Sequence, residues 1–160
     1  MRRFLAVFAA AALALMLCGC GRLSRTEYYE QLTACFEEYS AALEEFDTVR
    51  ADVTSSQEIM LEQTKATEIC ERAEKALDGF TKMNPPEEFA KKHEELLAAV
   101  ELERKFVTAT KKVLTARTPD ELSKYGSEAE TIFNGIPEEK QFAAVYGKLS
   151  MEVKSAAGGE

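Results

Sequence analysis

Apolar residues recur at helical spacing along three long stretches of the chain. Within each stretch the steps between them are three, four or seven residues, which keeps them on one face of an α-helix. The opposite faces carry mostly Glu and Lys, as solvated helix surfaces do. No stretch alternates with a period of two, so the pattern predicts an all-α chain without a sheet. The three stripes are Tyr29, Leu32, Phe36, Tyr39, Leu43 and Phe46; Ile59, Ala66, Cys70, Ala73, Leu77 and Phe80; and Phe89, Leu96, Val100, Val107 and Leu114.

Helix start signals divide this pattern into four arms. Ser24 followed by Glu27 forms a capping box, in which each side chain can bond the backbone N–H of the other residue. Three similar signals follow, two of them with proline at the first helical position. These are Ser55 with Glu58, Asn84 with Pro85 and Glu87, and Thr118 with Pro119 and Glu121.

The last arm is interrupted at Asn134-Gly135-Ile136-Pro137, which predicts a left-handed cap and then a proline that restarts a helix. Its halves, 119–133 and 137–154, together match the length of the third arm, 85–116. We therefore expect an antiparallel up-and-down bundle of four arms, the last broken near Asn134 to Pro137. The alternative is a separate fifth helix folded back across one end. The bundle is expected over residues 24–155, with a frayed tail at 156–160.

The first residues have the layout of a secretory signal peptide. Arg2 and Arg3 precede an apolar run over residues 4–17, and the small residue Gly19 stands before Cys20. As a helix this run would rise only about 21 Å, whereas the hydrocarbon core of a bilayer is roughly 30 Å thick. The run is therefore short for a stable membrane span, and residues 1–19 are expected to be removed.

The segment Leu17-Cys18-Gly19-Cys20 resembles the lipobox of bacterial lipoproteins. The resemblance implies cleavage before Cys20 and attachment of diacylglycerol to its sulfur, with fatty-acyl chains such as palmitate. Two or three acyl chains would then hold the protein on the outer face of the cell membrane. Cys18 competes poorly because Leu17 precedes it, where the family has a small residue. The alternative is an uncleaved signal anchor. Residues 20–23 form only a short tether, so the body is expected close to the bilayer.

A second resemblance concerns the start of the third arm. Asn84-Pro85-Pro86-Glu87-Glu88-Phe89, leading into His93, is similar to small uncharacterised helical lipoproteins of Gram-positive bacteria. It implies a helical-bundle body and no particular activity.

The charge balance restricts the kinds of molecule that the protein can bind. The chain has 20 Lys and Arg against 28 Asp and Glu, a formal net charge of −8. Removal of the signal peptide takes away only positive charges. Such a body is repelled by phosphate backbones, which argues against a nucleic-acid partner. Roughly 140 remaining residues suffice for one core, so we expect a single domain and a monomer.

Cys35 and Cys70 are candidates for a disulfide bond. A hairpin turn at residues 51–54 would place them at the same height on adjoining antiparallel helices. Leu32 would then face Ala73, and Phe46 would face Ile59. Outside the cytoplasm such a pair can oxidise and stabilise the hairpin. The alternative is two reduced, buried cysteines that pack as small hydrophobes.

No catalytic or metal-binding constellation is present in the sequence. His93 is the only histidine, and a bundle metal site would want Glu at position 90, where Ala stands. We interpret His93 as a core histidine bonded to a neighbouring carboxylate. Phosphate loops, nucleophile elbows and a second histidine are lacking. The aromatic residues of the first arm are interpreted as core rather than as a ligand groove; these are Tyr28, Tyr29, Phe36, Tyr39 and Phe46.

Two hypotheses of function follow. The first is a noncatalytic binding or interaction module at the cell envelope, touching another envelope protein or the cell wall, without a cofactor. It predicts an exposed apolar patch or groove on the body. The alternative is a carrier of a small ligand or metal, which predicts a closed cavity lined by the tyrosines or by His93 with carboxylates.

Overall fold

The computed structural model describes residues 21–52 and 56–158. In this part of the chain all regular structure is helical, and no strand occurs. The predicted all-α class is therefore confirmed. The predicted signal peptide, Cys20, the Ser55 cap and the side chain of Ile59 lie outside the described residues. The elements are α2 (Arg25–Asp52), α3 (Ser56–Thr81), η2 (Glu87–Phe89), α4 (Ala90–Thr115), α5 (Pro119–Asn134), η3 (Glu138–Lys140) and α6 (Phe142–Ala157).

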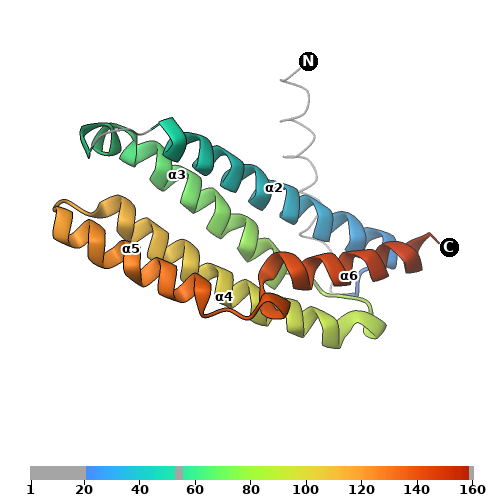
Figure 1. The fold of residues 1–160 in the computed structure, drawn as a ribbon. Helices are drawn as coiled ribbons and strands as arrows, with labels where there is room; N and C mark the ends of the chain where they lie inside the picture. The colour runs from blue at the N-terminus through green and yellow to red at the C-terminus, as the bar shows by residue number, and fades with distance from the viewer. Residues whose placement is uncertain (1–20, 53–55, 159–160) are drawn as a thin grey trace, which may run out of the picture.

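The helices form an antiparallel bundle with a broken fourth arm, as the sequence predicts (Figure 1). The chain reverses from α2 to α3, from α3 to α4 and from α4 to α5, and α6 then continues in the direction of α5. The two parts of the fourth arm are displaced sideways from each other. Helix α5 packs mainly against α4, whereas α6 packs against both α2 and α4. A fifth helix folded back across one end, the alternative arrangement, is therefore wrong.

One of the predicted capping boxes forms in full, and a second forms in part. At the start of α2, the Glu27 N–H donates to Ser24 Oγ at 3.2 Å, and the Ser24 N–H donates to Glu27 Oε2 at 2.9 Å. At the start of α5, the Glu121 N–H donates to Thr118 Oγ1 at 3.2 Å, but the Glu121 carboxylate accepts from the Arg117 N–H at 2.9 Å and not from that of Thr118. Both caps satisfy N–H groups that the first helical turn leaves without an intrahelical acceptor.

The predicted box at Asn84 is wrong. Helix α4 begins at Ala90, after the 3-10 turn Glu87–Phe89, rather than at Pro85. Pro86 adopts an extended conformation with ψ of 150°, and a residue before proline is itself disfavoured in the helical region. Two consecutive prolines therefore delay the helix. The Asn84 side chain instead donates to the Gly21 carbonyl oxygen at 3.2 Å.

The break in the fourth arm also differs in detail. Gly135 has φ of −78°, so it is not the left-handed cap that was predicted. Pro137 precedes the short turn η3, and the second half of the arm begins only at Phe142. At the other end α6 continues to Ala157, and Ala156 packs against the core, so part of the expected frayed tail is helical.

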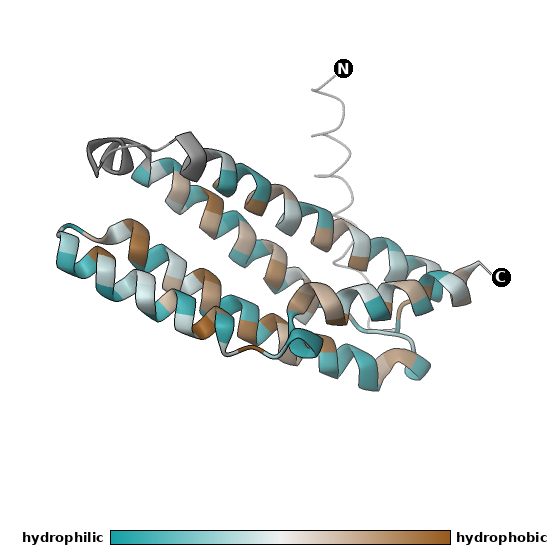
Figure 2. Ribbon diagram, viewed as in Figure 1, coloured by the Kyte–Doolittle hydropathy of each residue, from teal (hydrophilic) through white to brown (hydrophobic). Residues whose placement is uncertain are grey.

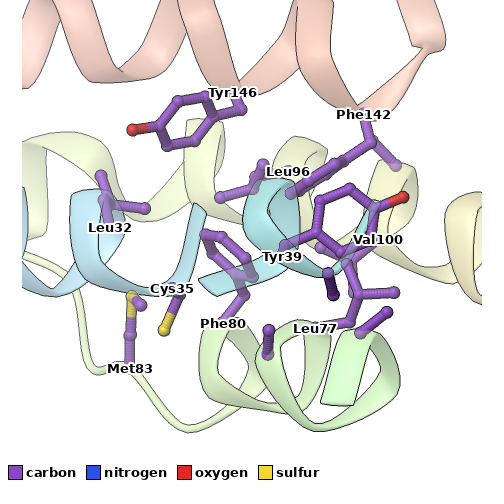
Figure 3. Packing of buried hydrophobic residues seen from close by; sticks show 14 of the residues in the cluster. Leu32, Cys35, Tyr39, Leu77, Phe80, Met83, Leu96, Val100, Phe142 and Tyr146 are labelled. Carbon is purple, nitrogen blue, oxygen red and sulfur yellow. The ribbon is translucent and has the colours of Figure 1, made fainter. Parts of the chain in front are cut away.

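One hydrophobic core runs along the inward faces of the helices (Figure 2). The stripes predicted on the first three arms supply most of it. Helix α6 adds Phe142 and Tyr146, which lie over Tyr39 and Phe80 in Figure 3. The Phe142 ring makes edge-to-face contacts with Phe80 at 5.3 Å and with Tyr39 at 5.2 Å between ring centroids, a geometry favourable to aromatic pairs.

The predicted register of the first hairpin is wrong. Cys35 packs against Gly79, where a side-chain methyl group would overlap its Sγ. Gly79 lies about 13 Å beyond Cys70 along α3 at helical rise. Helix α2 ends at Asp52 and α3 begins at Ser56, so the contact of Cys35 with Gly79 shows that the two helices are offset along their axes and are not symmetrical about the turn. Cys35 and Cys70 are both buried and free, and this register does not bring them together for a disulfide bond.

Candidate functional site between helices α2 and α5

An apolar cleft of about 560 Å³ lies between α2 and α5. Helices α3 and α4 form its floor, because the packing order of the bundle runs from α2 through α3 and α4 to α5. The mouth opens between α2 and α5, which are not closely packed. This volume is in the range of small-molecule binding sites. The lining consists of Ala42, Leu43, Phe46 and Asp47 on α2; Ile69, Cys70 and Ala73 on α3; Phe106, Val107, Thr110, Val113 and Leu114 on α4; and Ala129, Glu130 and Phe133 on α5.

The cleft exists because α5 covers too little of the core. Ala129 is the one residue of α5 that is buried, and its small side chain cannot reach across to α2. Phe133, one turn later, packs its ring against Phe106 with centroids 5.3 Å apart and still remains 46% exposed. Covering a phenyl ring that is this exposed, at the edge of an apolar hollow, lowers the free energy of the protein and its surroundings.

A partly buried, hydrogen-bonded pair lies next to the cleft along α2 and α4. The Tyr39 hydroxyl donates to Glu103 Oε1, one turn below Leu43 on α2 and Phe106 on α4. Burial raises the pKa of Glu103, and the hydrogen bond from Tyr39 offsets part of this rise. Burial and the Glu103 carboxyl group also raise the pKa of Tyr39. The pair therefore links α2 to α4, and the Tyr39 phenol remains protonated at neutral pH.

Cys70 is the one cysteine in the lining of the cleft. Burial raises the pKa of its thiol to about 11, and burial likewise raises that of Cys35 to about 11. A thiol with such a pKa is almost entirely protonated at neutral pH, and the thiolate is the reactive form. Both cysteines thus pack as small hydrophobic residues.

His93 lies in the other half of the bundle, away from the cleft. It is 4% exposed, and its Nδ1 is hydrogen-bonded to the Tyr28 hydroxyl at 2.8 Å. The prediction of a core histidine is confirmed, but the partner is a phenol rather than a carboxylate. Burial lowers the pKa of His93, and the nearby Phe80 carbonyl offsets part of this, although Nε2 has no partner in hydrogen-bond geometry.

The aromatic residues of the first arm divide between core and cleft. Tyr28 and Tyr39 are buried, and Phe36 stacks on Tyr146 with centroids 3.8 Å apart, as the core interpretation predicts. Phe46 instead lines the cleft. The sequence analysis did not favour this position for Phe46, since it set a groove aside in favour of the core. Nor did the sequence single out Phe133, because the exposure of that ring depends on where α5 lies across the bundle.

Within residues 21–52 and 56–158, no group of three or more His, Cys, Asp or Glu side chains is placed to hold a metal ion. In the same residues, no helix combines the length and apolarity that a membrane span requires. No known family model, curated protein or solved structure matches the chain.

Proposed function

We propose that the protein is a noncatalytic binding module of the cell envelope, held on the membrane by lipid on Cys20, that takes an apolar group into the cleft between α2 and α5. The observation that carries this proposal is the cleft itself, which is open and has an apolar, three-phenyl lining. The envelope-module hypothesis expected an exposed groove. The carrier hypothesis expected a closed cavity lined by tyrosines or by His93, and none of these residues lines the cleft.

The connection between anchor and body supports a defined orientation. The Leu23 N–H donates to the Asn84 carbonyl at 2.9 Å, and the Asn84 side chain donates back to Gly21 at 3.2 Å. Arg22 and Glu87 form an ion pair beside them. The tether is thereby fixed to the loop before α4. A lipid on Cys20 would hold this end of the bundle at the bilayer, with the cleft about 25 Å further out at helical rise.

Anchoring is tested by labelled fatty-acid uptake in a bacterial host that processes lipoproteins. Replacement of Cys20 with Ala should abolish the label and leave an unprocessed or released protein, whereas Cys18→Ala should keep it. Label that persists in Cys20→Ala and disappears in Cys18→Ala would overturn the anchor assignment.

Binding in the cleft is tested with the body, residues 21–160. The core of the described residues lies between Leu23 and Ala156, so this fragment carries its own core. Circular dichroism and a cooperative melt verify its fold before titration. The neutral probe N-phenyl-1-naphthylamine, which fluoresces in apolar surroundings, should bind to the folded body.

A matched pair of variants locates the probe. Phe133 and Met151 are both large, exposed apolar residues, at 46% and 67% exposure, and they lie on α5 and α6 respectively. Phe133→Glu should weaken probe binding by about fivefold or more, because the phenyl ring forms part of the apolar lining. Met151→Glu should leave it unchanged. An equal loss in both variants, or no binding to the folded body, would contradict the proposed site.

A further inference from the structure

The charge of the cleft restricts what it can hold. Two of its lining residues are ionisable acids, Asp47 on α2 and Glu130 on α5, and both are exposed. The lining contains no Lys, Arg or His among the residues that the structure describes. An anionic ligand such as a fatty acid would therefore place its carboxylate beside two like charges, which is unfavourable.

The two acids stand on opposite walls at nearly the same height. The hydrogen bond between Tyr39 and Glu103 aligns α2 with α4, which places Asp47 within one residue of the height of Lys112. Lys112 is ion-paired to α5 at 3.0 Å, half a turn from Glu130. Asp47 and Glu130 are thus within about one helical turn, about 5 Å, of each other along the bundle axis.

Two lysines next to the lining residue Val113 in the sequence of α4 already have partners. Lys111 pairs with Glu74 at 2.9 Å, and Lys112 pairs with Glu128 at 3.0 Å. Neither lysine lines the cleft. The negative charge at the mouth is therefore not balanced by a cation within the lining, and it is available to a ligand.

Aromatic rings add a second attraction for cations. Phe46, Phe106 and Phe133 line the cleft from three different helices. The face of a phenyl ring is negative, and it attracts an ammonium group within about 6 Å of its centroid. Rings combined with carboxylates are the groups that recognise organic ammonium ions, while the aliphatic lining suits an attached hydrocarbon.

We propose that the ligand of the cleft is an organic ammonium ion that carries an apolar chain. The chain fills the apolar interior between α3 and α4, and the ammonium group lies at the mouth between Asp47 and Glu130. This inference rests on the proposed function of the cleft and adds the charge of its ligand.

The test uses the body, residues 21–160, with a single fluorescent reporter. The chain contains no tryptophan, so Phe133→Trp introduces one indole at the rim of the cleft and keeps an aromatic ring there. Three probes share one alkyl chain and differ in head group: decyltrimethylammonium, decanol and decyl sulfate, each far below its micelle-forming concentration. The cation should bind most tightly and the sulfate most weakly, and added salt should reduce the difference.

Neutralising variants in this background assign the preference to the two acids. Asp47→Asn and Glu130→Gln should each weaken binding of decyltrimethylammonium about two- to fivefold, the usual strength of an exposed ion pair, and leave decanol binding unchanged. Glu94→Gln is the control. Glu94 is an exposed acid on α4 in the half of the bundle without the cleft, so its loss changes the net charge equally and should not affect the cation.

The outcomes separate the two proposals. If decanol binds as tightly as the cation, or if Glu94→Gln weakens the cation as much as the cleft variants do, the ammonium inference is wrong while the apolar cleft stands. Tighter binding of decyl sulfate would also overturn it. If no probe changes the fluorescence of the folded Phe133→Trp body, both the inference and the proposed binding cleft fail.

Discussion

The two halves of the bundle use the same three long helices but differ in the fourth. In the tether half, which contains α6, the fourth helix inserts between α2 and α4 and closes the core. In the cleft half, which contains α5, the fourth helix rests on α4 and leaves a hollow facing α2. Helix α6 buries four large side chains, whereas α5 buries only Ala129. The four are Phe142, Tyr146, Leu149 and Val153.

This difference assigns different tasks to the two halves. The tether half excludes water from a dense aromatic core, and we infer that it supplies most of the stability. The cleft half retains apolar surface that the chain itself does not cover. Binding sites are commonly less stable than the rest of a protein, because side chains that contact a ligand cannot also pack against the core.

The largest contrast should come from one phenylalanine in each half. Phe142 is 2% exposed and contacts four rings of the core, so Phe142→Ala should cost about 3–5 kcal/mol of unfolding free energy. Phe133 is 46% exposed, and Phe133→Ala should cost less than about 1 kcal/mol. Urea unfolding of both variants checks this. Equal costs would mean that the cleft half is packed as tightly as the tether half.

A smaller effect is expected where α2 meets α3. Alanine usually stabilises a helix by about 1 kcal/mol relative to glycine, but at Gly79 the added methyl would overlap Cys35 Sγ. Gly79→Ala should therefore destabilise the protein by about 1–3 kcal/mol. Cys35→Ala in the same chain should relieve most of the loss. As a control, Gly147 on α6 has open space at the same position, and Gly147→Ala should be neutral or stabilising. Stabilisation by Gly79→Ala would refute the register.

Loss of the cap on α5 should lower the local stability of this helix by about 1 kcal/mol. Thr118→Ala removes the acceptor of the Glu121 N–H. Because α5 packs mainly on one neighbour, its amides should exchange faster with deuterium in this variant, with α6 unchanged. Ser24→Ala, which removes the α2 cap, is the matched control and should leave α5 exchange unaltered. If exchange in α5 and α6 rises together, the halves do not open separately.

Acidification should have the mildest effect, and it should arise in the tether half. Burial lowers the pKa of His93 in the folded protein, so between that value and about 6.5 the unfolded chain binds more protons. The contribution of neutral, buried His93 to stability is therefore complete above about pH 6.5 and is lost as the pH falls. Urea unfolding from pH 7.5 to 5.5 should show this decline, and His93→Gln should flatten it. NMR of the single histidine should give a pKa below 6.5; a higher value would contradict the burial.

The local elements were well predicted because they depend on neighbours in sequence. The cap at Ser24 needs only Glu27, and the stripe on α3 needs only its own period. The predicted cap at Asn84 failed where Pro86 changed the backbone. The Cys35–Cys70 pairing failed because it assumed that α2 and α3 are symmetrical about the turn, whereas Cys35 packs against Gly79.

By itself the sequence determined that this body is helical, where α2 and α5 start, which faces are apolar and that its fourth arm is broken. Helical periodicity and capping are short-range properties, so a few neighbouring residues suffice to specify them. Only the tertiary structure decided that α6 inserts into the core while α5 leans on α4, and hence that Phe46 and Phe133 line a cleft. The sideways position of a helix depends on the fit of all its neighbours at once, which no local pattern records.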